Sequence, residues 1–580
     1  MQAASGAGSG SGSRPSAIRK WGPLAGIVVV VAVVAALVLG GGGNDVADNE
    51  ATSTSGGPVD SSSDTTAGGP AEWTYPLMFP DAEELGIADT IDWGERCDTD
   101  RGRLKVIDSF APACAAPFSG DNGGATDQGV TADEITIVHY MGPDGDPIIN
   151  YITDSIKVDD TNAQEEEVVS GFMEYFQTYY ELYGRTINYV VYESTGLAND
   201  EVTARADAQR IVDEFQPFAV VGGPALTNAF ADELAALETL CVSCGGGSPS
   251  WFADRDPYVW ALDGNAEQKQ VHVVEFIGKQ LAGKPAVHAG DEFTDTERRF
   301  GLVYVESGAE SKELADLMVE RMTAAGATPA EVIPYQLDPG TLQQTASQVI
   351  AKLKAAGVTS VVLATDPVAP KDFTREATAQ EYFPEWIVAA ATLVDTTAFG
   401  RSYDQQQWAH AFGVTSLAVR LNPEVSGYWA LYKWFTGTEP AADESIGVYM
   451  PAFFLLMSGL QSTGPDLTHE NLANTFRSFS TIPAISRPWL TWGDQGIWDT
   501  PDYNGIDDAT LFWWDAEAVG PDENRKEGTG MMLYVDGGQR YLPGQWPTED
   551  RLFLDDGAVA VYDTAPAGEE PPQYPSPAAG

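Results

Sequence analysis

The feature that most constrains the fold is a unit of strand, glycine-rich turn and helix, which is clearest between residues 218 and 234. The apolar run from Phe218 ends at Gly222-Gly223, and a helical segment begins near Asn228. Such a unit places backbone N–H groups at the carboxyl edge of a sheet, where small ligands bind in open α/β proteins. Since every α/β domain contains several such units, their number and grouping decide the interpretation.

Units of this kind occur in two groups along the chain. The first group predicts strands at residues 135–140, 187–193, 218–221, 241–244 and 258–262, with helices at 163–183 and 201–215. The second group predicts strands at 300–306, 331–337, 359–365 and 386–390, with helices at 311–325, 342–356 and 371–380. Glycines close several of these helices, as is common where crossovers join parallel strands. We therefore predict an α/β fold of two similar lobes with doubly wound parallel sheets.

After residue 415 the pattern returns to helices and then to strands. We expect helices at 423–435, 448–460 and 468–479, strands at 490–499 and 509–515, and a hairpin at 531–542 that turns at Asp536-Gly537. The run at 448–460 is strongly apolar but too short for a membrane span. It therefore predicts a buried packing helix.

Length, charge and cysteine content narrow the class of protein. At 580 residues the chain is too long for a single core. A net charge of −53 argues against nucleic acid and anionic membrane surfaces as partners. Four cysteines fit an oxidising compartment, and we expect Cys97 and Cys114 to form a disulfide. Cys241 and Cys244 have redox-motif spacing, but their place in a strand favours a structural bridge or an inert pair.

The amino terminus is expected to direct export. Basic residues precede an almost wholly apolar run, which predicts a transmembrane helix used as an anchor or a cleaved signal, with the anchor favoured. The expected order of segments is cytoplasmic residues 1–20, the apolar run at 21–39, a flexible linker at 40–70, a loop-rich disulfide extension at 71–130 and, after the lobes, a partly disordered tail at 546–580. The protein is therefore expected at the cell membrane with an extracellular domain, or secreted if the signal is cleaved.

Enzymatic signatures are missing from the sequence. It contains no G-x-G-x-x-G after a strand, no P-loop, no G-x-S-x-G and no H-E-x-x-H. The five histidines show no zinc-ligand spacing, and we expect neither a metal nor a cofactor. The segment Asp502-x-Asn504-Gly505 hints at a calcium loop but is better explained as a polar connection between strands. The sequence thus favours binding over catalysis.

Six strand-end loops are expected to face one another across a cleft between the lobes. They begin near residues 141, 222 and 244 in the first lobe and near 306, 364 and 389 in the second. Small residues and N–H groups on the first side suit a carboxylate or another polar head group. Glu310 and Asp366 on the opposite side suit an ammonium group.

The order of these elements resembles type I periplasmic binding proteins of the leucine/isoleucine/valine-binding kind, which are the receptors of ABC importers. The resemblance rests on residues 130–143, 207–223 and 298–326 and on the closing strands. It implies two lobes, formed by 131–262 with 417–490 and by 263–416 with 506–545, joined by three crossings. It also implies that the ligand is held by Thr227, Asn228, Gly247 and Ser248 in the first lobe and by Glu310, Asp366 and Thr392 in the second.

The resemblance implies a monomeric receptor that binds a small polar ligand and delivers it to an ABC permease. An amino-acid-like molecule, an amide or a cationic solute is the expected ligand. Two alternatives stay open. One is a membrane-anchored sensor or scavenger without a permease, and the other is an extracellular hydrolase.

Overall fold

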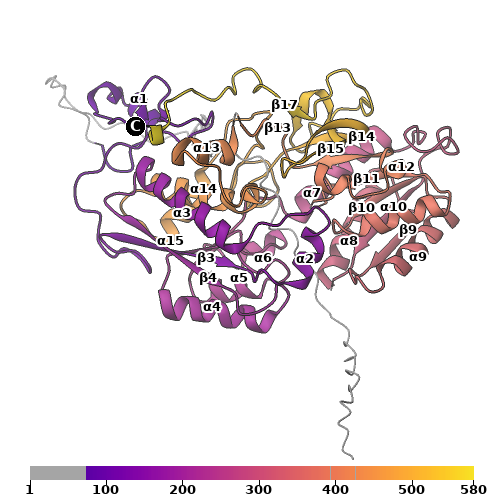
Figure 1. Cartoon of the computed structure of the whole chain (residues 1–580), viewed down its shortest axis with the longest axis horizontal. Coiled ribbons are helices and arrows are strands. Elements are labelled where there is room, and N and C mark those ends of the chain that lie inside the picture. The colour runs from indigo at the N-terminus through magenta and orange to yellow at the C-terminus, as the bar shows by residue number, and fades with distance from the viewer. Residues whose placement is uncertain (1–72, 308, 392, 425, 580) are drawn as a thin grey trace, which may run out of the picture.

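The computed structural model describes residues 73–579 apart from Gly308, Thr392 and Val425. These residues form two α/β lobes that lie side by side, with the indigo and magenta part of the chain in lobe 1 and the salmon part in lobe 2 (Figure 1). The predicted two-lobed α/β architecture is confirmed. The predicted apolar anchor or signal at 21–39 and the linker at 40–70 lie outside the described residues.

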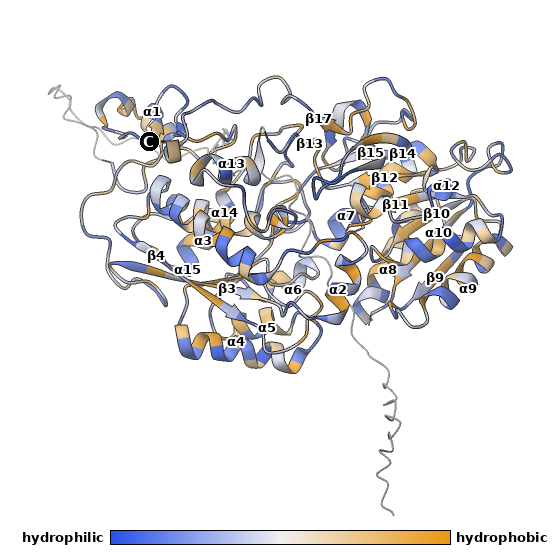
Figure 2. Cartoon of the chain, in the orientation of Figure 1, coloured by the Kyte–Doolittle hydropathy of each residue, from blue (hydrophilic) through white to orange (hydrophobic). Residues whose placement is uncertain are grey.

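Lobe 1 is built on a five-stranded parallel sheet in the order β4-β3-β5-β6-β7. The strands are β3 (Glu134–Met141), β4 (Thr186–Glu193), β5 (Ala219–Val221), β6 (Leu240–Val242) and β7 (Val259–Trp260). The connecting helices are α2 (Pro147–Thr153), α3 (Asn162–Tyr179), α4 (Glu201–Phe215), α5 (Ala229–Ala236) and α6 (Pro249–Ala253). Hydrophobic and hydrophilic residues alternate along α4, as expected for a helix that covers one face of a sheet (Figure 2).

Three later helices complete lobe 1 after the chain has passed through lobe 2. They are α13 (Gly427–Thr436), α14 (Ile446–Thr463) and α15 (His469–Ser478). In the part of the chain that the structure describes, α14 is the one helix whose length and composition would suit a membrane span, and 83% of it is buried. Phe453 and Leu456 of α14 belong to the core of lobe 1. The prediction of a buried packing helix is confirmed.

Lobe 2 is built on an eight-stranded mixed sheet in the order β15-β14-β12-β11-β10-β8-β9, with β16 also paired to β14. The strands are β8 (Phe300–Val305), β9 (Glu331–Tyr335), β10 (Ser360–Ala364), β11 (Glu385–Ala389), β12 (Ala411–Thr415), β14 (Ala509–Pro521), β15 (Glu527–Tyr534) and β16 (Arg540–Tyr541). The helices are α7 (Ala266–Phe276), α8 (Ala309–Ala324), α9 (Leu342–Ala355), α10 (Ala369–Ala379), α11 (Thr397–Gly400) and α12 (Gln405–Trp408). Strands β8 to β12 are parallel, and β14 closes the sheet in antiparallel direction.

Two predictions for the carboxyl-terminal region are wrong, one of a strand and one of a hairpin. Residues 490–499 do not form a strand, and they make only isolated bridges such as Leu490 with Ile506. Residues 531–542 do not form a hairpin, because β15 and β16 both pair with β14. Asp536 has a φ of 49°, and this left-handed turn returns the chain to β14 instead of folding it back on β15.

The lobes are joined by three crossings, near residues 261–265, 416–419 and 502–508. The first and third lie side by side, since the Ala261 N–H donates to the Tyr503 carbonyl at 3.0 Å. Asp502 accepts hydrogen bonds from the Gln268 amide at 2.9 Å and from the Asn504 N–H at 2.8 Å. Burial raises the pKa of Asp502 to about 7. The contacts of Asp502 fit the polar connection preferred over a calcium loop.

The amino-terminal extension and the carboxyl-terminal tail pack together on lobe 1. Cys97 and Cys114 form a disulfide, and a small apolar core around Phe79 and Trp93 surrounds it. The tail ends beside α1 (Phe79–Glu84) in Figure 1, and the Trp434 indole donates to the Tyr574 carbonyl at 3.0 Å. The described part of the tail, expected to be partly disordered, is therefore held by contacts with the extension and lobe 1.

Candidate ligand-binding site

A cavity of about 360 Å³ lies between the lobes at the carboxyl ends of β3 and β5. Strand order reverses at β3, because β4 pairs with one of its edges and β5 with the other. In open α/β sheets a ligand crevice forms at such a reversal, since the loops after the two strands leave in opposite directions. Residues at the end of β3, including His139 and Tyr140, line the cavity together with Gly222 and Gly223 after β5.

One wall of the cavity is a strap, which we define as residues 142–160, that leaves β3 of lobe 1 and packs against lobe 2. Ile152, on α2 within the strap, belongs to the apolar core of lobe 2. Asp146 caps α2 by accepting from the Ile148 N–H at 2.8 Å, and it also accepts from the Ala198 N–H of lobe 1 at 2.7 Å. The strap therefore spans the cleft. Its side chains Ile149, Ile152 and Ile156 form an apolar wall.

Both lobes add apolar side chains to this wall. Leu393 and Phe399 come from lobe 2, and Val448, Tyr449 and Ala452 come from α14 of lobe 1. Tyr449 donates its hydroxyl to the Ala442 carbonyl at 2.9 Å. The residue therefore contributes its ring to the cavity, while its hydroxyl is engaged elsewhere.

His139 is a buried polar residue of the wall and is 3% exposed. Its Nδ1 lies 2.9 Å from the Tyr189 hydroxyl, and its Nε2 lies 3.2 Å from Glu165 Oε1. Burial and nearby Glu165 raise the pKa of Tyr189, so its hydroxyl stays protonated and donates to Nδ1. The proton of the imidazole then belongs on Nε2, where it is donated to the Glu165 carboxylate.

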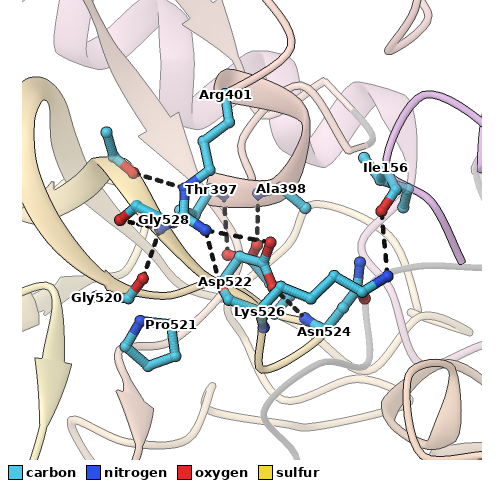
Figure 3. A network of polar contacts seen from close by, with 12 residues as sticks. Ile156, Thr397, Ala398, Arg401, Gly520, Pro521, Asp522, Asn524, Lys526 and Gly528 are labelled. Carbon is cyan, nitrogen blue, oxygen red and sulfur yellow. Dashed lines mark hydrogen bonds and ion pairs between the residues drawn. The ribbon is translucent and has the colours of Figure 1, made fainter.

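Three further carboxylates line the cavity and are held by protein donors. Asp160 accepts from the Ser445 N–H and hydroxyl, both at 2.7 Å. Glu444 forms an ion pair with Lys526 at 2.6 Å. Glu523 accepts from two backbone N–H groups at the start of α11, those of Thr397 at 3.0 Å and Ala398 at 2.8 Å; Figure 3 shows these two donors.

The β14–β15 turn, residues 521–527, joins lobe 2 to the opposite side of the cleft. Arg401 stabilises the turn by donating to the carbonyls of Gly520 at 2.6 Å and Gly528 at 3.0 Å and to Asp522 at 3.3 Å (Figure 3). Lys526 reaches the strap by donating to the Ile156 carbonyl at 3.4 Å. These contacts hold the lobes in a closed arrangement.

A second contact of the same turn reaches lobe 1 directly. Arg525 forms an ion pair with Asp443 and also donates to the Asp443 carbonyl at 2.9 Å. The side chains of this pair are 25% and 32% exposed, so solvent screens their attraction. The turn thus contributes a modest latch across the cleft.

Of the six predicted ligand residues that the structure describes, none lines this cavity. Thr227 accepts from the Ala229 N–H at 3.1 Å, and Asn228 donates to the Gly246 carbonyl at 2.8 Å. Both polar side chains therefore brace loops of lobe 1. Gly222, Gly223, Pro224 and Ala225, which precede them in the same turn, line the cavity.

The other predicted residues also have structural partners. Ser248 caps α6 by accepting from the Trp251 N–H at 3.2 Å, and a Cβ at Gly247 would lie 2.8 Å from the Trp251 ring. Asp366 is buried and caps α10, accepting from the Val368 N–H at 2.8 Å. The Asp366 carboxyl is thus engaged within lobe 2 and does not line this cavity. Thr392 lies outside the described residues.

Two predicted residues from opposite lobes do meet. Glu310 accepts a hydrogen bond from the Ser248 backbone, and Arg255 lies close enough to attract its carboxylate. Burial, with repulsion from Glu313, raises the pKa of Glu310. These residues therefore form a contact between the lobes outside the cavity.

The sequence reasoning missed His139 and Glu165. His139 is the polar residue in the otherwise apolar end of the first strand, directly before a glycine-rich loop. The position of His139 in the strand could have indicated a site residue, although the sequence does not identify Glu165 as its partner. Cys241 and Cys244 form a disulfide at the end of β6, as the structural reading of their spacing expects, and Cys244 lines the cavity. No group of three or more His, Cys, Asp or Glu residues is placed to hold a metal ion anywhere in the described ranges.

Two α/β lobes with a cavity between them at a strand-order reversal have the arrangement of a small-molecule binding site. A family model described as periplasmic binding protein matches residues 160–506, more than half of the 580 residues. The chain belongs to the periplasmic binding protein family. No curated protein matches it in sequence.

Several solved structures are similar to the chain. A solute binding protein of an ABC transporter from Rhodopseudomonas palustris, in complex with 3,4-dihydroxybenzoic acid, is 12% identical with a TM-score of 0.46, over 69% of this chain and 97% of that one. A branched-chain amino acid transporter substrate binding protein from Streptococcus pneumoniae, in complex with isoleucine, is 10% identical with a TM-score of 0.46. The match covers 69% of this chain and 100% of that one. A branched-chain amino acid ABC transporter periplasmic ligand-binding protein from Burkholderia xenovorans is 12% identical with a TM-score of 0.48. The match covers 73% of this chain and 100% of that one.

Proposed function

We propose that this protein is an extracytoplasmic receptor that closes its two lobes on a small solute and delivers the solute to an ABC permease. The observation that carries the proposal is the cavity of about 360 Å³, whose walls come from both lobes and from the strap. Its volume falls within the range of small-molecule sites, roughly 300–1,000 Å³. Because both lobes contribute to the wall, a bound solute stabilises the closed form relative to an open one.

Binding is favoured over hydrolysis by the contacts of His139. A catalytic base holds one ring nitrogen against a nucleophile that it can deprotonate, and the raised pKa of Tyr189 disfavours loss of its proton to His139. In His139 one ring nitrogen contacts Tyr189 and the other contacts Glu165. The histidine of the cavity is therefore committed to internal contacts.

A thermal shift screen of the purified full-length chain against amino acids, amides, amines and aromatic solutes tests the binding function. Micromolar binding corresponds to about 8 kcal/mol and would give a clear stabilisation. Ile149→Trp fills the cavity and is expected to abolish the shift. Asn150→Trp, at the exposed neighbouring position on α2, is the matched control and should retain it. Absence of a shift with every class of solute would contradict the proposal.

Delivery to a permease is tested separately. Cross-linking in membranes of the native host, followed by isolation of the chain, should recover a multi-span membrane protein together with an ATPase subunit. A chain that binds its solute but recovers neither subunit is a membrane-anchored sensor or scavenger instead. Amino-terminal sequencing of the mature chain shows whether residues 21–39 are retained as an anchor.

A further inference from the structure

Among the described residues that line the cavity, the acids outnumber the bases. Its lining includes four carboxylate residues, Asp160, Glu165, Glu444 and Glu523, and none of the described lining residues is a lysine or arginine. A carboxylate ligand would therefore enter a region of like charge. An ammonium group would be attracted, and more strongly than in water because apolar walls surround it.

The first-lobe turn after β5 offers few donors for a carboxylate. Pro224 has no N–H group. The Gly222 N–H donates to the Val242 carbonyl at 3.1 Å, and the Leu226 N–H donates to the Ala198 carbonyl at 3.0 Å. At most two backbone N–H groups of the turn remain for a ligand. A carboxylate here would lose its hydration shell without gaining a full set of donors or a counter-charge.

Glu165 is the acid of the wall that is free to meet a ligand. Asp160 and Glu523 accept backbone hydrogen bonds, and Glu444 pairs with Lys526. Glu165 Oε1 lies 3.2 Å from His139 Nε2, and the Glu165 side chain is 22% exposed. Because a carboxylate accepts several hydrogen bonds, the contact with His139 leaves capacity for a second donor.

Glu165 is not needed to cap its own helix. It lies in the first turn of α3, where an acid is favoured by the helix dipole. The start of α3 is already capped, since Thr161 accepts from the Gln164 N–H and the Gln164 side chain accepts from the Thr161 N–H at 2.9 Å. A ligand contact therefore remains a physical reason for an acid at this place in the wall.

The rest of the wall suits an apolar body. The side chains of Ile149, Ile156, Leu393, Phe399 and Val448 line the same cavity. Tyr449 adds an aromatic ring, and aromatic rings attract ammonium groups. The site therefore combines a large apolar surface with the carboxylate of Glu165, which, among the described residues, is paired with no lysine, arginine or backbone donor of the kind that holds the other three acids.

We propose that the ligand is a small, mainly apolar molecule that carries a protonated amine and no carboxylate, with its ammonium group at Glu165. This inference rests on the proposed solute-binding function and names the ligand class of the same cavity. It separates this site from one that holds an α-amino acid, whose carboxylate would find no lysine or arginine among the described lining residues to balance its charge.

Two matched series of probes test the inference on the purified full-length chain. Isoamylamine, isoamyl alcohol, isovalerate and L-leucine share a branched aliphatic body and differ in charge. Phenethylamine, phenethyl alcohol and phenylacetate do the same with an aromatic body. Dissociation constants from ligand-observed NMR titrations are expected to be about tenfold or more lower for each amine than for the alcohol and the carboxylate, as for a hydrogen bond to a charged group.

Glu165→Gln tests the residue itself. The substitution keeps one side-chain oxygen that can accept from His139 but removes the negative charge. The preference for the amine over the alcohol should therefore fall to about threefold or less. Glu174→Gln, at an exposed position on the same helix, is the matched control and should keep the preference. Circular dichroism of both variants verifies folding, and the wild-type probe series decides the question even if Glu165→Gln does not fold.

The outcomes separate the two proposals. If isovalerate, phenylacetate or L-leucine binds more tightly than the amines, the cationic ligand is overturned while the solute-binding function stands. If Glu165→Gln keeps the full preference in a folded protein, the assignment of the ammonium to Glu165 is overturned. If no amine binds but another solute stabilises the chain, the ligand class is again wrong. If no solute of any class binds, the receptor function itself fails.

Discussion

Loss of one partner of the buried ion pair between Arg298 and Glu385 is expected to destabilise lobe 2 strongly. Arg298 precedes β8 and Glu385 begins β11, so the pair joins two strands at the sheet edge opposite the cavity. Arg298 Nε donates to Glu385 Oε2 and Arg298 Nη2 donates to Oε1, both at 2.8 Å. The side chains are 1% and 0% exposed. Such a pair tolerates the loss of one partner poorly.

Arg298→Met removes the guanidinium and keeps an apolar chain of similar length. Glu385 would then retain the Ser360 hydroxyl at 2.6 Å and the His288 N–H at 3.2 Å as donors but would have no counter-charge. Leaving a buried charge unpaired costs about 3–5 kcal/mol. The double variant Arg298→Met/Glu385→Leu removes both charges and leaves two neutral donors unsatisfied, which costs about 2 kcal/mol at roughly 1 kcal/mol each. The double variant should therefore be more stable than Arg298→Met.

Native-state hydrogen exchange of the amides in β8, β10 and β11 measures the free energy of opening of lobe 2 without assuming that the whole chain unfolds in one step. Arg299→Met, at the exposed neighbouring position, is the control and should change this free energy by less than about 0.5 kcal/mol. The reasoning is refuted if Arg298→Met lies within about 1 kcal/mol of wild type, or if the double variant is less stable than Arg298→Met. Solute binding should persist in every folded variant, because the pair lies away from the cavity.

Three further predictions follow from other parts of the fold. Burial raises the pKa of Asp395 from 3.8 to about 7, so the folded state keeps a proton that the unfolded state releases. The free energy of unfolding should therefore fall as pH rises from about 4 to about 7. Equal pH slopes of this free energy for wild type and Asp395→Asn would count against the prediction. Replacing Cys97 and Cys114, which are 17 residues apart, by serine should remove about 3 kcal/mol from the extension, seen as new protease cleavage within residues 73–130 while the lobes resist. Arg525→Gln removes the partly exposed ion pair with Asp443, which is worth about 0.5 kcal/mol. The radius of gyration of the ligand-free chain, measured by small-angle X-ray scattering, should then increase slightly. An unchanged radius would mean that the pair does not favour closure.

Agreement between sequence and structure is good where local patterns decide the outcome. Alternating apolar strands and glycine-ended helices predict the parallel strands of both sheets, and the apolar run at 448–460 lies within the buried helix α14. Agreement is poorer where a strand needs a partner that lies far away in the chain. Residues 490–499 have strand character but make only isolated bridges, and β16 pairs with β14 rather than with its neighbour β15.

The candidate site shows the same division. The sequence predicts that the turn at Gly222 borders a cleft, because a parallel strand ends there and its loop must lie at the carboxyl edge of the sheet. The direction of each polar side chain depends on local capping, which turns Thr227 toward the Ala229 N–H and Asp366 toward the start of α10. Thr227 and Asp366, which the loop sequence assigns to the ligand, therefore bond within their own lobes and do not line this cavity.

By itself the sequence determines the α/β class, the division into two lobes and the acidity of the chain, because periodicity and composition are local properties. The tertiary structure decides what forms the cavity. The strap crosses from β3 to the core of lobe 2, and Lys526 pairs with Glu444, 82 residues earlier in the chain by their numbering. His139 and Glu165 meet because β3 and α3 pack together. Such contacts follow from packing between distant segments, so no local pattern in the sequence specifies them.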